Sequence, residues 1–355
     1  MRDLAAELRK WHAAEKDYAV ATVIGVTGSA PRPPGAALAV DADGIVIGSI
    51  SGGCVEGAVY ELCREVLRTG QPVRETFGYS DDDAFAVGLT CGGKLEVFVQ
   101  RITAVERVAI EAVLRTDEAV ALVRDLKTGA VMAIGSWWTV GAAFDEVVVA
   151  EARAMLDTGA TGVREIGCGA REVTVFVESY VPPPRMIVFG AIDFAAAVTR
   201  IGRFLGYHVT VCDARPVFAT RARFPDADEI VVQWPDRYLA RTQVDSRTVL
   251  CVLTHDAKFD IPLLEVALRL PVAYVGAMGS RRTHEDRMAG LRAAGVTESE
   301  LAQLHSPIGL DLGARTAEET AVSIAAEIVA VRRGGSAQPL TATGGPIHRD
   351  LIPVW

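Results

Sequence analysis

The first half of the chain mixes apolar runs of strand length with stretches of helical periodicity, which predicts a mixed α/β domain. A strand over Tyr18–Val26 precedes a hairpin, in which Ala36–Val40 and Ile45–Gly48 flank an Asp-Ala-Asp-Gly turn. The apolar positions that follow recur at helical spacing and predict an amphipathic helix that begins near Gly53 and buries Val55, Val59, Leu62 and Val66. Further helices are predicted over Leu4–His12, Ala104–Arg115 and Glu146–Asp157, and further strands over Val73–Phe77, Leu95–Val99, Ala119–Val123, Val131–Ile134 and Val173–Val177.

The second half alternates strands and helices more regularly. A buried strand over Met186–Phe189 is followed by a helix that Gly206 ends, and the next strand, Val209–Cys212, leads to Asp213. Later strands are predicted over Val249–Leu253 and Val272–Val275, each followed by a helical stretch. This alternation indicates a Rossmann-like, doubly wound parallel sheet, whose ligands are expected at the carboxyl ends of its strands.

Three consecutive prolines, Pro182 to Pro184, separate the two patterns, because a proline run continues neither a helix nor a sheet. The chain of 355 residues is long enough for two domains, each with its own core. We therefore expect an N-terminal mixed α/β domain over residues 1–180, a Rossmann-like domain over 185–335 and a loosely ordered tail over 336–355.

Composition narrows the class of protein. With 50% hydrophobic and 23% charged residues, the chain resembles ordinary soluble globular proteins. The net charge of -9 argues against a nucleic-acid partner. We expect no signal peptide and no membrane span, since the longest uncharged run is broken by glycines. The six cysteines include no CxxC pair and no zinc-ligand spacing, so we predict no metal site and a reducing, cytoplasmic location.

The first candidate site combines cysteine with glycine. Cys54 follows Gly52 and Gly53 at the predicted start of a helix, where backbone N–H groups and the helix dipole favour an anion such as a thiolate. The glycines leave the backbone open to a ligand. A second cysteine, Cys91, precedes Gly92 and Gly93, and the two cysteines form a candidate reactive pair. The alternative is that both are small buried residues between packing glycines.

Arg32 is the one charged residue in a loop that contains three prolines, and it is a candidate anion clamp. The alternative for Arg32 is a solvated loop charge.

The carboxyl ends of the predicted parallel strands carry the other candidates. Gly190 stands where a dinucleotide-binding fold has its first glycine, and Asp213 stands where such a fold has its ribose-binding acid. His255 follows a later strand. The glycine turn at Gly279 and Ser280 enters a helix with Arg281 and Arg282, a pattern typical of a phosphate cradle. The alternatives are capped helix starts and, for His255, a hydrogen-bonded core residue.

Several of these motifs together resemble the XdhC/CoxI family of xanthine dehydrogenase accessory proteins. The resemblance extends over nearly the whole chain and is specific. It is carried by Gly28-Ser29 through Arg32 and Gly35, Gly48 to Glu56, Cys91-Gly92-Gly93, Leu253 to Asp256, Tyr274–Arg282, and Pro307 to Asp311 with Arg315-Thr316.

The resemblance implies an accessory protein that binds the molybdenum cofactor, supports its sulfuration and delivers it to the apoenzyme of a molybdenum hydroxylase. It also implies a cysteine-bearing N-terminal domain and a C-terminal Rossmann domain. We expect Cys54 and Cys91 to line a site between these domains. The phosphate of the pterin cofactor is then expected at Gly279–Arg282. A cysteine desulfurase and a second copy of the chain are the other expected partners, and we expect a maturation factor more than a turnover enzyme.

One turn departs from the family. The family turn usually reads GAGHVA. In this chain the turn begins Gly190-Ala191-Ile192-Asp193, so that Ile192 and Asp193 replace the second glycine and the histidine. A branched side chain and a carboxylate both oppose a pyrophosphate, so we expect weak or absent binding of NAD and NADP. Asp193 is expected instead to cap the helix as its N-cap. The rival hypothesis is an NAD(P)-dependent oxidoreductase with a catalytic cysteine.

Overall fold

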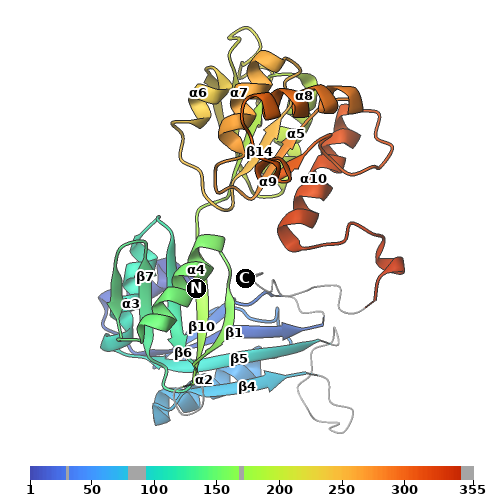
Figure 1. Ribbon diagram of the computed structural model, residues 1–355. Helices are drawn as coiled ribbons and strands as arrows, with labels where there is room; N and C mark the ends of the chain where they lie inside the picture. The colour runs from blue at the N-terminus through green and yellow to red at the C-terminus, as the bar shows by residue number, and fades with distance from the viewer. Residues whose placement is uncertain (29–31, 79–92, 168–171, 345–355) are drawn as a thin grey trace. The chain divides into compact units, whose positions relative to one another are not determined.

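The structure is a computed structural model that describes residues 1–28, 32–78, 93–167 and 172–344. The chain divides into two compact units, Met1–Pro182 and Pro183–Trp355. In Figure 1 the first unit is coloured from blue to green and the second from yellow-green to red. The first unit contains antiparallel sheets with helices and the second a parallel sheet with helices. The predicted α/β class is therefore confirmed.

The N-terminal unit contains two five-stranded sheets among its described residues. The first sheet has the strand order β3-β2-β1-β5-β4, and the second has the order β8-β7-β6-β10-β9. Its strands are β1 (Tyr18–Thr27), β2 (Ala37–Asp41), β3 (Val46–Gly48), β4 (Val73–Phe77), β5 (Lys94–Ile102), β6 (Val120–Asp125), β7 (Val131–Gly135), β8 (Thr139–Gly141), β9 (Gly162–Ile166) and β10 (Val173–Tyr180). Its helices are η1 (Arg2–Leu4), α1 (Ala5–Ala13), α2 (Glu56–Thr69), α3 (Ala104–Arg115) and α4 (Glu146–Thr158).

The two sheets of this unit repeat one topology. Each is built from a helix, three strands, a second helix and two strands, and in each the strands are ordered third, second, first, fifth, fourth. One face of the first sheet packs on α2, and one face of the second packs on α4. The other faces share a core with α1 and α3. The hydrophobic pattern alone did not indicate this internal repeat.

The C-terminal unit contains one parallel sheet with the strand order β13-β12-β11-β14-β15-β16. Its strands are β11 (Arg185–Phe189), β12 (His208–Asp213), β13 (Glu229–Val232), β14 (Val249–Val252), β15 (Tyr274–Ala277) and β16 (Leu304–His305). Its helices are α5 (Asp193–Phe204), α6 (Pro235–Leu239), α7 (Ala257–Ala267), α8 (Arg281–Ala293), α9 (Glu298–Leu301), α10 (Ala317–Arg333) and η3 (Leu340–Ala342).

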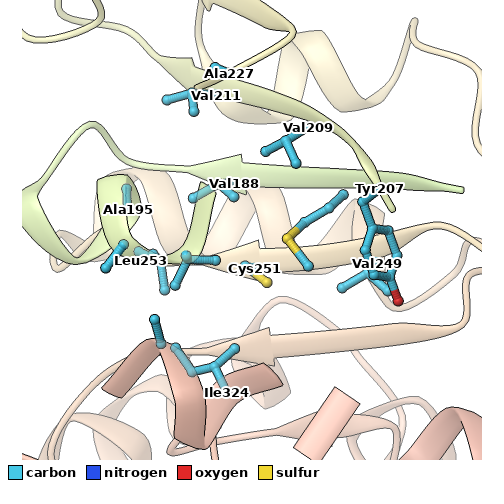
Figure 2. Close-up of a cluster of buried hydrophobic side chains, with 14 of the residues drawn as sticks. Val188, Ala195, Tyr207, Val209, Val211, Ala227, Val249, Cys251, Leu253 and Ile324 are labelled. Carbon is cyan, nitrogen blue, oxygen red and sulfur yellow. The ribbon is translucent and has the colours of Figure 1, made fainter. Parts of the chain in front are cut away.

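Helices cover both faces of this parallel sheet. On one face, α5 and α10 enclose a core that includes Val188, Cys251 and Ile324, which Figure 2 shows as sticks. On the other face, α6, α7, α8 and α9 enclose a second core. The strand order reverses between β11 and β14, and such a switch point places the ligand-binding crevice outside the carboxyl ends of the strands.

Most predicted elements have the predicted place, and the differences have local causes. The helix α2 begins at Glu56, three residues later than expected, because Gly53 and Cys54 belong to a turn. The strand β15 runs from Tyr274 to Ala277, so the prediction over Val272–Val275 began two residues early. Short elements such as β8, β9, β13 and α6 were missed, since their exposed positions break the apolar pattern.

Within the described ranges, no helix has both the length and the apolar character needed to cross a membrane.

Candidate functional site

The segment Ser49–Val55, which we call the cysteine turn, joins β3 to α2 and carries Cys54. Gly52 and Gly53 adopt φ values of +78° and +122°, a region that favours glycine. Both are exposed, and beyond the adjacent residues no described atom lies within 4 Å of the position that a Cβ would take at either glycine. The backbone of this turn is therefore open on one side, and Cys54 beside it is half-buried.

Glu56, the first residue of α2, holds the cysteine turn in place. Its carboxylate accepts hydrogen bonds from the hydroxyl of Ser49 at 2.8 Å and from the backbone N–H groups of Ser51 at 2.9 Å and Gly53 at 2.8 Å. The Ser51 hydroxyl also donates to Glu56 and accepts from the N–H of Val55 at 3.1 Å. Burial alone raises the pKa of Glu56, but these hydrogen bonds outweigh it and lower the pKa to about 2.

This arrangement changes the interpretation of the helix start. We expected the backbone donors near Gly53 to stabilise a cysteine thiolate, whereas in the structure those of Ser51 and Gly53 donate to the Glu56 carboxylate. No role was expected for Glu56. The signal was present as a glutamate at the first helical position after two serines, but only the folded turn shows which donors reach it.

The other cysteines fall into two groups. Cys91, Gly92 and Cys168 lie outside the described residues, whereas Gly93 is described and is buried directly before β5. Three further cysteines lie in packed elements, and burial raises the pKa of each thiol to about 12: these are Cys63, Cys212 and Cys251. The prediction that Cys63 belongs to the core is confirmed. Among the described cysteines, Cys54 is thus the one that is not fully buried.

Arg32 lies close to the start of the cysteine turn. It lines a cavity of about 550 Å³ together with Gly48 and Ser49. Its guanidinium lies 3.6 Å from the exposed carboxylate of Asp3. An exposed pair of this kind is weak, so an anionic ligand could compete for Arg32.

In the C-terminal unit, the turn after β11 is closed by Asp213. Gly190 has φ +106°, and a Cβ there would lie 3.0 Å from the backbone nitrogen of Thr254, so this position requires glycine. The N–H of Ala191 donates to Asp213 at 2.7 Å, and Arg215 donates to the same carboxylate through its backbone N–H and its guanidinium. Burial raises the pKa of Asp213, but these bonds together lower it below its usual value. The expected ribose-binding acid is therefore already engaged by Arg215.

The expected capping role of Asp193 is wrong. The N-cap of α5 is Ile192, which has extended backbone and makes no side-chain capping bond. Asp193 is the first helical residue, and its exposed carboxylate pairs with Arg223 at 3.0 Å. A capping side chain must come from the non-helical residue before the first turn, and the helix begins one residue too early for Asp193 to provide it.

The start of α8 keeps the features of a phosphate cradle. Ser280 caps the helix by accepting from the N–H of Thr283 at 3.1 Å. Gly279 has φ +158°, at the edge of the glycine-favouring region, and a Cβ there would lie 3.1 Å from the side chain of Thr283. Arg281 and Arg282 are exposed, and neither forms an ion pair with another described residue. The helix start is capped, as the alternative foresaw, and it also presents these two cations.

The segment after β14 places His255 differently from the alternative expected for it. His255 is exposed, so the alternative of a hydrogen-bonded core residue is wrong for it. Its neighbour Thr254 is buried and donates to Asp260 of α7. Asp256 caps α7 by accepting from the N–H of Lys258 at 3.1 Å. The buried polar group at this strand end is thus the threonine, while His255 faces solvent.

A buried ion pair that the sequence did not reveal connects these strand ends. Arg287 of α8 donates to Asp260 at 2.8 Å, and both side chains are almost completely buried. The same guanidinium donates to the backbone carbonyl of Met278 at 2.8 Å and to the hydroxyl of Ser306 at 3.0 Å. Since Asp260 also accepts from Thr254, the pair fixes the chain after β14 relative to the chain after β15.

Known families and proteins resemble both units. The model of the XdhC and CoxI family matches residues 11–78, which include the cysteine turn, and the model of the XdhC Rossmann domain matches residues 186–328. A Bacillus subtilis protein named as a probable subunit of xanthine dehydrogenase is 27% identical over 90% of this chain and 94% of its own length. The molybdenum cofactor insertion chaperone PaoD of Escherichia coli is 24% identical over 89% of this chain and 84% of its own length.

A solved structure supports the same fold. The crystal structure of a xanthine dehydrogenase from Bacillus halodurans has a TM-score of 0.62 and 23% sequence identity, and the match covers 96% of this chain and 97% of that chain. The two family models follow each other in the order of the two units, and the relatives align along nearly the whole chain. The resemblance inferred from the motifs is thereby confirmed. The chain belongs to the XdhC and CoxI family.

Proposed function

We propose that this chain is an accessory protein for the maturation of a molybdenum hydroxylase of the xanthine dehydrogenase type. It binds the molybdenum cofactor, supports its sulfuration and passes it to the apoenzyme. The observation that carries the proposal is the similarity along 89% of the chain to a protein named as a molybdenum cofactor insertion chaperone. A cytoplasmic location, a cysteine desulfurase as sulfur donor and a homodimeric state belong to the same proposal.

The start of α8 suits the phosphate of a pterin cofactor. Arg281 and Arg282 are exposed cations without ion-pair partners among the described residues. Charge-assisted hydrogen bonds from arginine to phosphate are strong, and a helix N-terminus favours negative charge. Their proposed role is to hold the anionic end of the cofactor.

The cysteine turn suits the molybdenum centre of the cofactor. The cofactor brings a molybdenum centre with sulfur ligands, for which a thiolate is a fitting neighbour. The open backbone at Gly52 and Gly53 allows a ligand to approach Cys54 closely. The proposed role of Cys54 is to contact the cofactor there, and Cys91 is proposed as a second contact.

The oxidoreductase alternative is not proposed, since no observation favours it. Asp213 is engaged by Arg215, and Ile192 places a branched side chain on the turn that would meet a pyrophosphate. Both features oppose a dinucleotide at the first βα turn.

The test is a cofactor-binding assay with molybdenum cofactor released anaerobically from a purified molybdoenzyme. The variant with Arg281→Ala and Arg282→Ala should bind it tenfold or more weakly, since each charge-assisted hydrogen bond contributes roughly 1.5–3 kcal/mol. Arg292→Ala is the matched control, because Arg292 is an exposed arginine near the other end of the same helix. Cys54→Ala should weaken binding or client activation while leaving the fold intact. Failure of the unmodified protein to bind the cofactor would overturn the proposal.

A further inference from the structure

The internal repeat of the N-terminal unit allows the cysteine turn to be compared with a second turn of the same protein. Gly48 at the end of β3 and Gly141 at the end of β8 have φ values of +83° and +111°. A Cβ at either glycine would lie 2.4 Å from the carbonyl oxygen of the residue that begins the adjacent strand, Ala37 or Val131. In each repeat the residue after the glycine donates its N–H to that carbonyl, at 3.2 Å and 2.8 Å. The two connections therefore begin in the same way.

Beyond this point the two connections differ. The second repeat reaches α4 through the four residues Ala142–Asp145, and its N-cap, Asp145, makes no side-chain capping bond. The first repeat uses the seven residues Ser49–Val55 and ties them to the carboxylate of Glu56. Since the shorter connection completes the same topology, joining strand to helix requires neither the additional residues nor the carboxylate network.

The hydrogen bonds to the Glu56 carboxylate therefore stabilise the particular conformation of the cysteine turn. We propose that Glu56 is a positioning residue that holds Gly52 and Gly53 in their open conformation and thereby fixes the place at which Cys54 meets a ligand. This inference rests on the proposed function for the identity of that ligand, the molybdenum cofactor. Glu146 occupies the same first helical position in α4 and has no such role, which makes it an internal control.

The experiment measures alkylation at each cysteine by peptide mass spectrometry, with neutral iodoacetamide and anionic iodoacetate as probes. In the unmodified protein, Cys54 should react faster than the three buried cysteines, whose raised pKa values and burial both slow alkylation: Cys63, Cys212 and Cys251. Glu56→Gln should raise the rate at Cys54 about threefold or more with iodoacetamide, because the turn is released. The rate with iodoacetate should rise further, by about another twofold, because a nearby negative charge that repels this probe is lost. Glu146→Gln should change neither rate.

Two further measurements separate positioning from stability. The Glu56→Gln variant should melt below the Glu146→Gln variant, because the stabilising contribution of the carboxylate is lost. At the assay temperature it should still be folded, so that Cys63, Cys212 and Cys251 react no faster than in the unmodified protein, and the amide proton resonance of Gly53 should move only in this variant. Ser51→Ala, which removes one hydroxyl donor but no charge, should raise the iodoacetamide rate at Cys54 without changing the ratio between the two probes.

The outcomes distinguish this inference from the proposed function. If the unmodified protein fails to bind molybdenum cofactor, the proposed function falls, while altered alkylation in Glu56→Gln alone still supports positioning. If the cofactor binds and Glu56→Gln weakens it at least fivefold, with Glu146→Gln unchanged, both are supported. Equal alkylation of Cys54 in the unmodified protein and in the Glu56→Gln and Ser51→Ala variants would overturn the positioning role.

Discussion

Removing the guanidinium of Arg287 should destabilise the C-terminal unit more than any surface charge does. Arg287 is 3% exposed and donates to Asp260, to the carbonyl of Met278 and to the hydroxyl of Ser306. In Arg287→Met, a side chain of similar length fills much of the space, but the carboxylate of Asp260 stays buried without its cationic partner. Its hydrogen bond from Thr254 remains. The change therefore leaves an uncompensated buried charge.

The magnitude follows from this burial. Breaking a buried ion pair by removing one partner costs about 3–5 kcal/mol. For a unit of this size, 1 kcal/mol corresponds to roughly 2–4 °C in melting temperature, so the expected decrease is about 6–20 °C. Arg292→Met is the matched control on the same helix. Its exposed pair with Glu298 should contribute little, and the melting temperature should hardly change.

Differential scanning calorimetry of the full chain is the assay, supported by urea unfolding followed through tryptophan fluorescence. A double-mutant cycle with Asp260→Leu gives the decisive number. Because the double variant Asp260→Leu with Arg287→Met leaves no buried charge unpaired, it should be more stable than the sum of the single changes predicts, by about 2–3 kcal/mol. Additive effects, or a decrease below 1 kcal/mol for Arg287→Met, would refute the reasoning.

Two more expectations follow from pKa shifts and from the βα turn. The folded pKa of Glu56, about 2, lies below its usual value of 4.5, so its stabilising contribution is present above about pH 4.5 and is lost as the pH falls toward 2. Acid titrations followed by circular dichroism should therefore show a flatter pH dependence for Glu56→Gln over this window, and an unchanged curve would contradict the assignment. Calorimetric titration should detect no saturable micromolar binding of NAD or NADP, whereas Ile192→Gly with Asp193→His should improve binding. Micromolar binding by the unmodified chain would show that the steric and charge arguments at this turn are incorrect.

The local pattern of apolar residues was enough to place most elements. The spacing of Val55, Val59, Leu62 and Val66 predicted the apolar stripe of α2. Leu62 is half-buried, and the other three are buried, as is Cys63. The strand β4 has the predicted bounds, Val73–Phe77. Such predictions succeed because an element must turn its apolar face away from water, and that requirement is written into neighbouring residues.

The fold class also followed from the sequence, because alternating strands and helices admit few topologies. The family followed separately, from the resemblance of motifs such as Gly48 to Glu56. The expected place of β15 failed by two residues, since its bounds depend on pairing with β14, where Val249 lies opposite Tyr274. The repeated strand order of the two N-terminal sheets was likewise invisible, because strand pairing is a property of segments that are distant along the chain.

The roles of single polar residues were decided by the tertiary structure. The sequence placed Asp213 correctly at the end of its strand, but only the fold brings the N–H of Ala191, 22 residues earlier in the chain, onto its carboxylate. The ion pair of Asp260 with Arg287 joins α7 to α8, although the two residues are 27 positions apart in the chain. A buried polar group must find a partner wherever the packing provides one, and hydrophobic periodicity carries no information about which partner that is.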